Sequence, residues 1–392
     1  MTRQSKIFKV ILTIVSSTIL SIIISYISEK VNVLEKFTVA INDVDFTDLY
    51  YQYKPRPKAD ENIVIVNIGY RNRTELAEML KVISINQPKV IGGDIFFDHE
   101  VDTVDVIGTN FLSNQVKALD NLVLASAYGG KTDDGTGIVA RQSPMIREHV
   151  KEGIVNLNIA TDDPEYGTVR SFYPVTDINK VKHLSFGFLV ASFLDSTVLK
   201  YATEYEMMIR WYGYGNDNSD GMFKTFDSHQ ILNGEFEKKD IEGKIVLLGF
   251  MGETFGDYVP GDIFFTPLNK KIIGRSLPDM YGVEVHANVI KMIVDKDFIY
   301  HSKTTDLLFN LILITIFTLG LFWIQSKYYK QYSILSKIAL IIFVDILIVG
   351  AIGVFWLTSG DIKFLIADGL FVMLFVPDTY EFLDNNLFAK FK

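Results

Sequence analysis

The sequence predicts an α/β domain with a mostly parallel sheet, joined to an α-helical transmembrane region with one N-terminal and about three C-terminal spans. Two observations predict this fold class. Long apolar segments lie at both ends of the 392-residue chain and match the roughly 20 residues that a helix needs to cross a bilayer. Between them, short apolar runs rich in β-branched residues alternate with segments of helical periodicity, which is typical of parallel α/β sheets.

Composition narrows the classes of function. The formal net charge is −9, which argues against nucleic acid as a partner because nucleic acid attracts clusters of Lys and Arg. The chain contains no Cys, which excludes disulfides, thiolate zinc sites and Cys nucleophiles. The sequence therefore predicts no nucleic-acid partner, no metal and no cofactor.

Four segments are candidate membrane spans. The N-terminal segment carries a single charge, Lys9, near its start, and it lacks a small-residue cleavage site, which favours an uncleaved anchor. The fourth segment is the shortest, and a helix lying on the membrane surface is the alternative there. The predicted spans cover residues 7–27, 307–324, 338–357 and 362–376.

The distribution of Lys and Arg predicts the orientation, because cytoplasmic flanks are enriched in both. Cations precede the first span, lie between the second and third spans, and end the chain. We therefore expect both termini in the cytoplasm and a bacterial inner-membrane location, with membrane lipid around the spans. The predicted organisation is an anchor (1–30), an extracytoplasmic domain (31–303), three transmembrane helices (304–380) and a cytoplasmic tail (381–392).

Within the exported domain, the pattern predicts alternating strands and helices. Apolar, β-branched runs predict buried strands at 63–69, 90–97, 121–128 and 244–250. Helical spacing of apolar residues predicts helices at 73–87, 104–118 and 283–294. The middle of the domain, 129–240, is less regular. Strands that alternate with helices imply crossover connections and a mostly parallel sheet.

The first ligand-binding candidates follow the second predicted strand. Asp94 and Asp98 share one face of that strand if it persists to residue 98. They lie towards its carboxyl end, where open α/β sheets place ligands. A metal or polar-ligand site is one interpretation, and a role in capping and fixing the loop is the other.

The second group follows the last predicted strand. In the glycine-rich segment 249–268, Asp257, Asp262 and Thr266 could face a ligand, although a structured loop that covers the sheet edge is the alternative. His286, in the helix that follows, could bind an anion, coordinate a metal or sense pH, or serve as a hydrogen-bonded structural residue. An acid/base pair of Asp257 and His286 is a further hypothesis, without a contact that the sequence predicts.

Two carboxylates fall inside predicted spans. Intramembrane carboxylates are costly and usually face a bundle interior or a partner. The depths of Asp345 and Asp368 differ by about 9 Å at about 1.5 Å per residue, which argues against a shared proton. Contact with another membrane protein, a proton-linked role and local hydrogen bonding are the three interpretations.

The order of these features resembles the second type of CHASE domain, a sensory extracellular domain associated with cyclases and histidine kinases. The resembling stretches start with IVIVNIG and KVIGGDIFFDHE, continue with GIVNLNIATDDPEYGTVRSFYPV, and end with GKIVLLGFMGETFGDYVPGDIFFTPL and YGVEVHANVI. The resemblance covers roughly residues 35–300. It implies an N-terminal span, an exported sensory domain and usually three further spans.

Three hypotheses follow. The first is a sensory or scaffolding subunit, not an enzyme, that binds a ligand or protein outside the cytoplasm and couples to a partner membrane protein. We expect this form because residues 381–392 leave no room for an output domain. A homodimer is a further expectation, by analogy with sensory proteins of this layout. The alternatives are an exported metal-dependent hydrolase that uses Asp94, Asp257 and His286, or an accessory subunit of an ion-coupled membrane complex.

Overall fold

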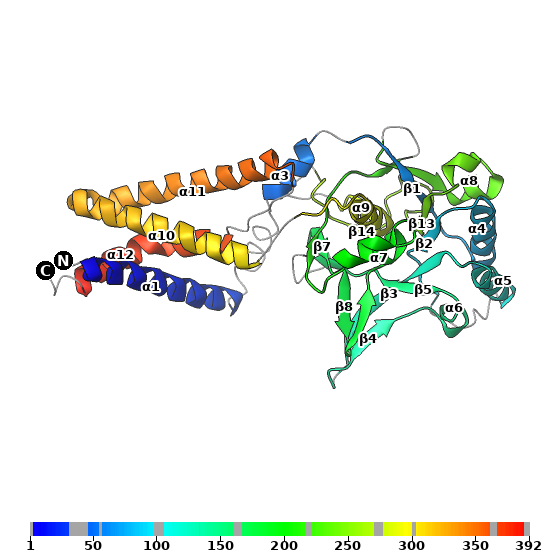
Figure 1. The fold of residues 1–392 in the computed structure, drawn as a ribbon, viewed down its shortest axis with the longest axis horizontal. Helices are drawn as coiled ribbons and strands as arrows, with labels where there is room; N and C mark the ends of the chain where they lie inside the picture. The colour runs from blue at the N-terminus through cyan, green and yellow to red at the C-terminus, as the bar shows by residue number, and fades with distance from the viewer. Residues whose placement is uncertain are drawn as a thin grey trace. The chain divides into compact units, whose positions relative to one another are not determined.

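A computed structural model describes residues 3–30, 46–54, 57–97, 106–132, 134–159, 167–216, 221–269, 277–299, 303–360 and 367–387. The chain forms two compact units. A helical unit comprises Met1–Tyr50 and Tyr300–Lys392, and an α/β unit comprises Tyr51–Ile299 (Figure 1). The predicted mixed α/β fold is confirmed at this level.

The α/β unit is built on an eight-stranded sheet in the order β11-β12-β1-β13-β2-β3-β4, with β5 also paired to β3. Every pairing in it is parallel except that of β3 with β4. The central strands are β1 (Asp60–Asn67), β13 (Ile245–Gly249), β2 (Val90–Gly93) and β3 (Leu122–Lys131). The outer strands are β12 (Phe223–Asp227), β11 (Gly215–Asn216), β4 (Gly137–Ala140) and β5 (Lys151–Ile154). The prediction of a mostly parallel sheet is therefore correct.

Helices cover both faces of this sheet (Figure 1). One face packs against α4 (Arg73–Ile85), α5 (Val106–Lys117) and α8 (Ser228–Asn233), and the other against α7 (Phe186–Ala191) and α9 (Gly282–Asp295). The central strands are apolar on both faces because both are covered. Asn72 caps the start of α4 by accepting a hydrogen bond from the Glu75 amide, which explains why the helix begins directly after it.

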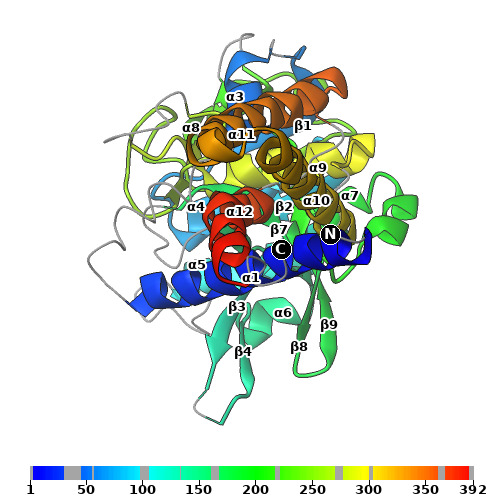
Figure 2. The same ribbon diagram turned by 90° about the vertical axis from the view of Figure 1, so that its left-hand side faces the viewer.

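Smaller elements complete the unit. A three-stranded antiparallel sheet contains β6 (Leu157–Ile159), β7 (Val169–Phe172) and β10 (Met207–Met208). Two further strand pairs are β8 (Val175–Ile178) with β9 (Val181–Leu184) and β14 (Ile263–Phe264) with β15 (Met280–Tyr281). The β8–β9 hairpin extends beside β4, where Asn179 exchanges hydrogen bonds with the backbone of Gly137 (Figure 2). Short helices are α6 (Pro144–Arg147), η1 (Ser196–Tyr201) and η2 (Lys238–Asp240).

The second strand is shorter than predicted. Strand β2 ends at Gly93 instead of residue 97. The Gln142 side chain occupies the place of a neighbouring strand, because it donates to the carbonyls of Ile95 and Ala125 and accepts from the Phe97 amide. Residues 95–97 therefore leave the ladder, and the strand face that was expected to continue beyond Asp94 does not form.

The helical unit contains four long helices: α1 (Arg3–Lys30), α10 (Lys303–Lys327), α11 (Tyr332–Leu357) and α12 (Ala367–Asn386). Among the described residues, three helical segments are long and apolar enough to cross a membrane: Ile7–Ile24, Thr304–Lys327 and Tyr329–Leu357. The predicted fourth span overlaps α12, which is not among them. Helix α12 contains Pro377 and several carboxylates, which lower its hydropathy. The short helices α3 (Phe46–Tyr53) and η3 (Tyr329–Gln331) complete the chain.

Candidate functional site

Polar side chains gather at the carboxyl ends of the central strands. Asn67 ends β1 and is fully buried. Its amide group donates to the Asp227 carboxylate at 2.8 Å and accepts from the amides of Gly69 and Met251. One side chain therefore joins the ends of β1 and β12 to the loop that follows β13, at the edge where α/β sheets place ligands.

Two predicted residues meet at this edge. Asp94 directly follows β2, and its backbone amide donates to the Leu248 carbonyl at 2.8 Å, which extends the pairing with β13 by one residue. His286 lies on the second turn of α9, and its ring makes an edge-type contact with the Phe186 ring, with centroids 5.3 Å apart. The Nε2 atom of His286 is 3.8 Å from Oδ2 of Asp94, and both side chains are almost entirely buried.

Asp262 joins this pair from the segment that precedes β14. Its backbone carbonyl accepts a hydrogen bond from the Gly282 amide at the start of α9. A Cβ atom at position 282 would lie 2.8 Å from Oδ1 of Asp262. Glycine at position 282 therefore lets the carboxyl group approach the first turn of the helix.

Burial controls the charge of this cluster. It raises the pKa of Asp94 to about 6, and burial together with the charge of Asp94 raises the pKa of Asp262 to about 7. Burial lowers the pKa of His286 to about 4, so its imidazole is neutral near pH 7. The described residues contain no group of three or more His, Asp and Glu arranged to hold a metal ion. The cluster is thus a buried set of polar groups that titrates in the mildly acidic range.

The other predicted residues lie elsewhere. Asp257 accepts hydrogen bonds from the amide and the hydroxyl of Thr254, which fixes a turn in the loop, and no contact joins it to His286. Asp98 lies outside the described residues. Thr266 is buried and contacts Asp279, a residue that was not among the predicted candidates.

A second site is a cavity of about 320 Å³ in the α/β unit. Its walls come from the end of α3, from the irregular segment 211–214 and from the residues that flank β14 and β15. Four aromatic residues line it: Tyr51, Trp211, Tyr212 and Tyr214. The polar residues of the lining are Gln52, Lys54, Asn269 and Asp279.

Asp279 is the acidic group of this cavity lining. One carboxyl oxygen accepts hydrogen bonds from the Thr266 hydroxyl at 2.7 Å and from the Tyr214 hydroxyl at 2.8 Å, and the other accepts from the Thr266 amide. Burial raises the pKa of Asp279 to about 6 against these hydrogen bonds, which lower it. The group is therefore mainly ionised at pH 7 and stays fixed in position.

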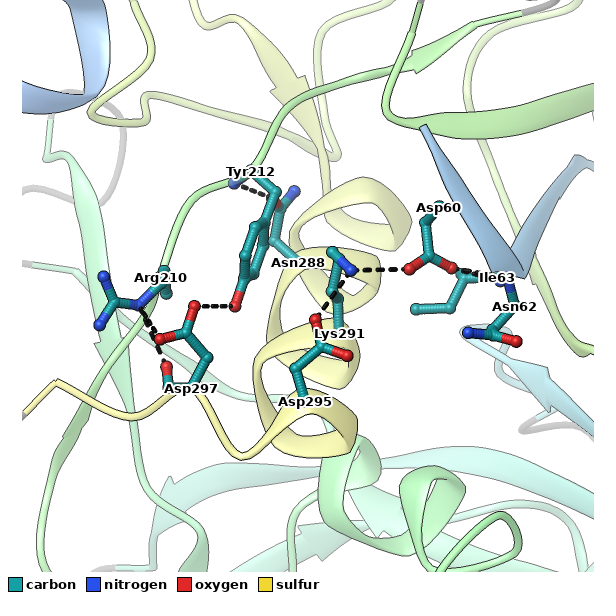
Figure 3. Close-up of polar contacts among 9 residues, drawn as sticks. All are labelled: Asp60, Asn62, Ile63, Arg210, Tyr212, Asn288, Lys291, Asp295 and Asp297. Carbon is teal, nitrogen blue, oxygen red and sulfur yellow. Dashed lines mark hydrogen bonds and ion pairs between the residues drawn. The ribbon is translucent and has the colours of Figure 1, made fainter. Parts of the chain in front are cut away.

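Helix α9 fixes the aromatic wall of the cavity. Asn288 is fully buried, and it accepts hydrogen bonds from the amides of Tyr212 and Gly213 and donates to the Gly213 carbonyl. The Tyr212 hydroxyl donates to Asp297 at 2.9 Å, so the side chain is held at both ends (Figure 3). Glu284 accepts from the Gly215 amide at 2.8 Å. Hydrogen bonds from the buried helix α9 thus hold the aromatic wall of the cavity in place.

Lys291 and Arg210 support the same wall. The Lys291 ammonium group donates to Asp60 at 2.7 Å and to Asp295 at 2.8 Å, and it lies over the Tyr212 ring (Figure 3). The buried Arg210 guanidinium pairs with Asp297 at 2.9 Å. Burial and the Asp297 charge raise the pKa of the Tyr212 phenol, which stays neutral.

The helical unit contains polar groups that were only partly predicted. Asp345 lies on α11 with an exposed side chain. Asp368 belongs to α12, but its side chain lies outside the described residues. A buried network that was not predicted joins three helices: Lys9 donates to Asp384 and to Gln325, while Gln325 donates to Asp384 at 2.6 Å. The single charge in the first span was its visible signal.

Comparisons with known proteins give one match. The model of the CHASE2 domain family matches residues 18–324, which is most of the chain. The search of curated proteins found no match. The search of solved structures also found none.

Proposed function

This chain belongs to the CHASE2 domain family, a family of extracellular sensory domains, and on that premise we propose that it is a membrane-anchored sensory subunit. In this proposal the α/β unit binds a small molecule outside the cytoplasm. The helical unit holds the protein in the membrane and couples it to a partner membrane protein. The family is sensory and not catalytic, which is compatible with a protein that is not an enzyme.

One observation carries the proposal: the aromatic cavity that contains Asp279. Its volume of about 320 Å³ lies at the lower end of the range of roughly 300–1,000 Å³ for small-molecule sites. Aromatic walls with a few fixed polar groups are the usual lining of such sites. The hydrogen bonds of Asn288 and Asp279 fix the lining in advance, which reduces the entropy that a ligand must lose on binding.

The charges in the lining indicate the class of ligand. The Asp279 carboxylate, with aromatic rings beside it, favours an ammonium group through an ion pair and cation–π contacts. Lys54 supplies a cation that complements a carboxylate. The ligand that uses both is a small zwitterion, of which a free amino acid is the simplest example.

The proposed orientation has both termini in the cytoplasm, which requires an even number of crossings. The bond between Lys9 in α1 and Asp384 in α12 supports this, because it brings the Arg3 end of α1 and the Asn386 end of α12 to the same end of the helical unit (Figure 1). Lys327 ends α10, and Lys330 lies in η3, which connects α10 to α11. Cations at the connection between α10 and α11 favour the placement of that connection in the cytoplasm.

A single-tryptophan variant tests ligand binding directly. The chain contains three Trp residues, and of these only Trp211 lines the cavity. In the full-length protein with Trp323→Phe and Trp356→Phe, the remaining fluorescence reports on the cavity. We expect at least one of the twenty common amino acids to change this fluorescence saturably, and its N-acetyl derivative, which lacks the ammonium group, to bind at least about tenfold more weakly.

Two variants on the same background complete the test. Asp279→Asn should weaken binding at least about tenfold, because the ion pair is lost. Asp120→Asn, at an exposed turn after α5, is the matched control and should bind normally. A flat response to all amino acids and simple amines, or equal binding by Asp279→Asn, would overturn the cavity as the sensory site.

A further inference from the structure

The two faces of helix α11 differ in what they contact. One face packs into the helical unit through Leu340, Phe343, Leu347 and Ala351. Phe343 stacks on Phe317 of α10, with ring centroids 5.1 Å apart. At about 100° per residue, position 345 falls almost opposite Phe343.

The opposite face points away from the described part of the helical unit. Ile338, Ile341 and Val349, each within about 40° of Asp345 around the helix, have exposed fractions of 47%, 62% and 68%. Asp345 lies among them and is itself exposed. It is the only charged residue between Ile338 and Leu357. The outward face of α11 is therefore an apolar surface with one carboxylate near its centre.

No group within the described residues neutralises this carboxylate. Asp345 makes no hydrogen bond or ion pair with any residue that the structure describes. Lys9, the cation inside the first span, already pairs with Asp384. The segment from Leu307 to Gln325 holds no charged residue. A lone carboxylate near the middle of a bilayer is costly, so such residues normally face a partner.

We propose that the face of α11 defined by Ile338, Ile341, Asp345 and Val349 docks a membrane-spanning helix of a second protein, and that this helix carries a Lys or Arg at the depth of Asp345. The proposal rests on the proposed function, because it names the partner through which the sensory unit is coupled. Charge complementarity identifies the occupant. A second copy of this chain brings another Asp345, while residues 307–325 and 338–357 contain no Lys or Arg and Lys9 is paired with Asp384, so a second copy does not complement this face.

Site-directed photocrosslinking tests the face. A photoreactive residue at Ile341 or Val349, in the full-length protein in its native membrane, should crosslink to one other membrane protein. The same residue at Leu347, on the inward face, is the matched control and should not capture that protein. The captured protein supports the proposal only if its crosslinked span contains a Lys or Arg.

Charge reversal then tests the pairing. Asp345→Asn should reduce the co-purified partner at least about tenfold, and Asp345→Lys should abolish it. Replacing the partner's basic residue with Asp should restore assembly with Asp345→Lys. Capture of a second copy of this chain, capture of a span without a basic residue, no crosslink at either outward position, or no rescue by the reversed pair would overturn the proposal.

Different measurements test the docking proposal and the ligand-binding proposal, so one can be refuted without the other. Asp345→Asn leaves every cavity residue in place, so amino acids should still change Trp211 fluorescence with normal affinity. If Asp345→Asn loses the partner but keeps ligand binding, the change acts on the docking face alone. If no amino acid changes Trp211 fluorescence in the single-tryptophan protein, only the proposal for the cavity is refuted.

Discussion

Lys9 near the start of α1 and Asp384 near the end of α12 form an ion pair whose side chains are only 2% and 1% exposed. Gln325 from α10 completes the network by bonding to both. The Lys9 ammonium group also lies over the Tyr380 ring. Three helices that are distant in the sequence are therefore held together by a charge pair that has no access to solvent.

Breaking this pair should destabilise the helical unit. Lys9→Met leaves Asp384 buried without its cation, which typically costs about 3–5 kcal/mol. The double variant Lys9→Met, Asp384→Leu should recover much of this loss because it removes both charges. Thermal unfolding of the detergent-solubilised protein measures the difference, and a double variant that is no more stable than Lys9→Met would contradict the explanation.

The stability of the α/β unit should depend on pH through Asp262. Its pKa is raised from the ordinary 3.8 to about 7, so between these values the folded state binds the proton more tightly than the unfolded state. Stability from this group is therefore present below about pH 4 and is lost as pH rises towards 7. Asp262→Asn should raise the free energy of unfolding by about 1–3 kcal/mol at pH 8 and leave it unchanged near pH 4.

His286 changes the pH dependence of the free energy of unfolding in the opposite direction to Asp262. Its pKa is lowered to about 4, so its contribution grows as pH rises from about 4 to its ordinary value of 6.5. Both the unmodified protein and Asp262→Asn contain His286, so the direct contribution of His286 cancels in the difference between their free energies of unfolding. Asp120→Asn should show no such pH-dependent difference, and an equal gain at pH 4 and pH 8 would refute the assignment.

Ligand affinity should fall in mild acid. The Asp279 carboxyl has a pKa of about 6, so it loses its charge as pH drops from 7 to 5 and binds an ammonium group less well. Thr266→Val removes a hydroxyl that lowers this pKa, and the midpoint should move to higher pH. Trp211 fluorescence titrations at several pH values measure both effects. Thr254→Val, which removes a hydroxyl bonded to Asp257, is the control.

The contact between β13 and α9 should not tolerate a larger residue at position 249. A Cβ atom there would lie 2.5 Å from the Cβ atom of Val283. Gly249→Ala should therefore destabilise the α/β unit by about 1–3 kcal/mol through overpacking. Gly320→Ala in α10 is the contrast, because a Cβ atom there meets no other atom within 4 Å. Equal melting temperatures for both variants would disprove the packing argument.

The elements with strong local patterns were predicted well. The apolar run at 244–250 became β13 (Ile245–Gly249), and the periodic segment at 283–294 became α9 (Gly282–Asp295). A run of apolar residues bounded by turn formers needs no long-range information to be identified. The shortened β2 is the exception, because the Gln142 side chain that ends it comes from 45 residues away along the chain.

The sites were harder to predict because their parts are remote in the sequence. Asp94 and His286 were both named, but the spacing of the residues does not reveal that a crossover brings α9 against the end of β2. The cavity was not predicted because its walls, such as 211–214, lack any periodicity. Asp384 was assigned to a cytoplasmic tail, and only the fold reveals that it pairs with Lys9.

The position of β1 in the sheet has a consequence for biogenesis. This strand is synthesised first, yet it lies between β12 and β13, and its last residue, Asn67, bonds to a side chain 160 residues later. Such distant pairing slows folding. The nascent domain therefore keeps the apolar run Ile63–Val66 of β1 unpaired until residues 223–249 have been synthesised, and during that interval the run is exposed to aggregation.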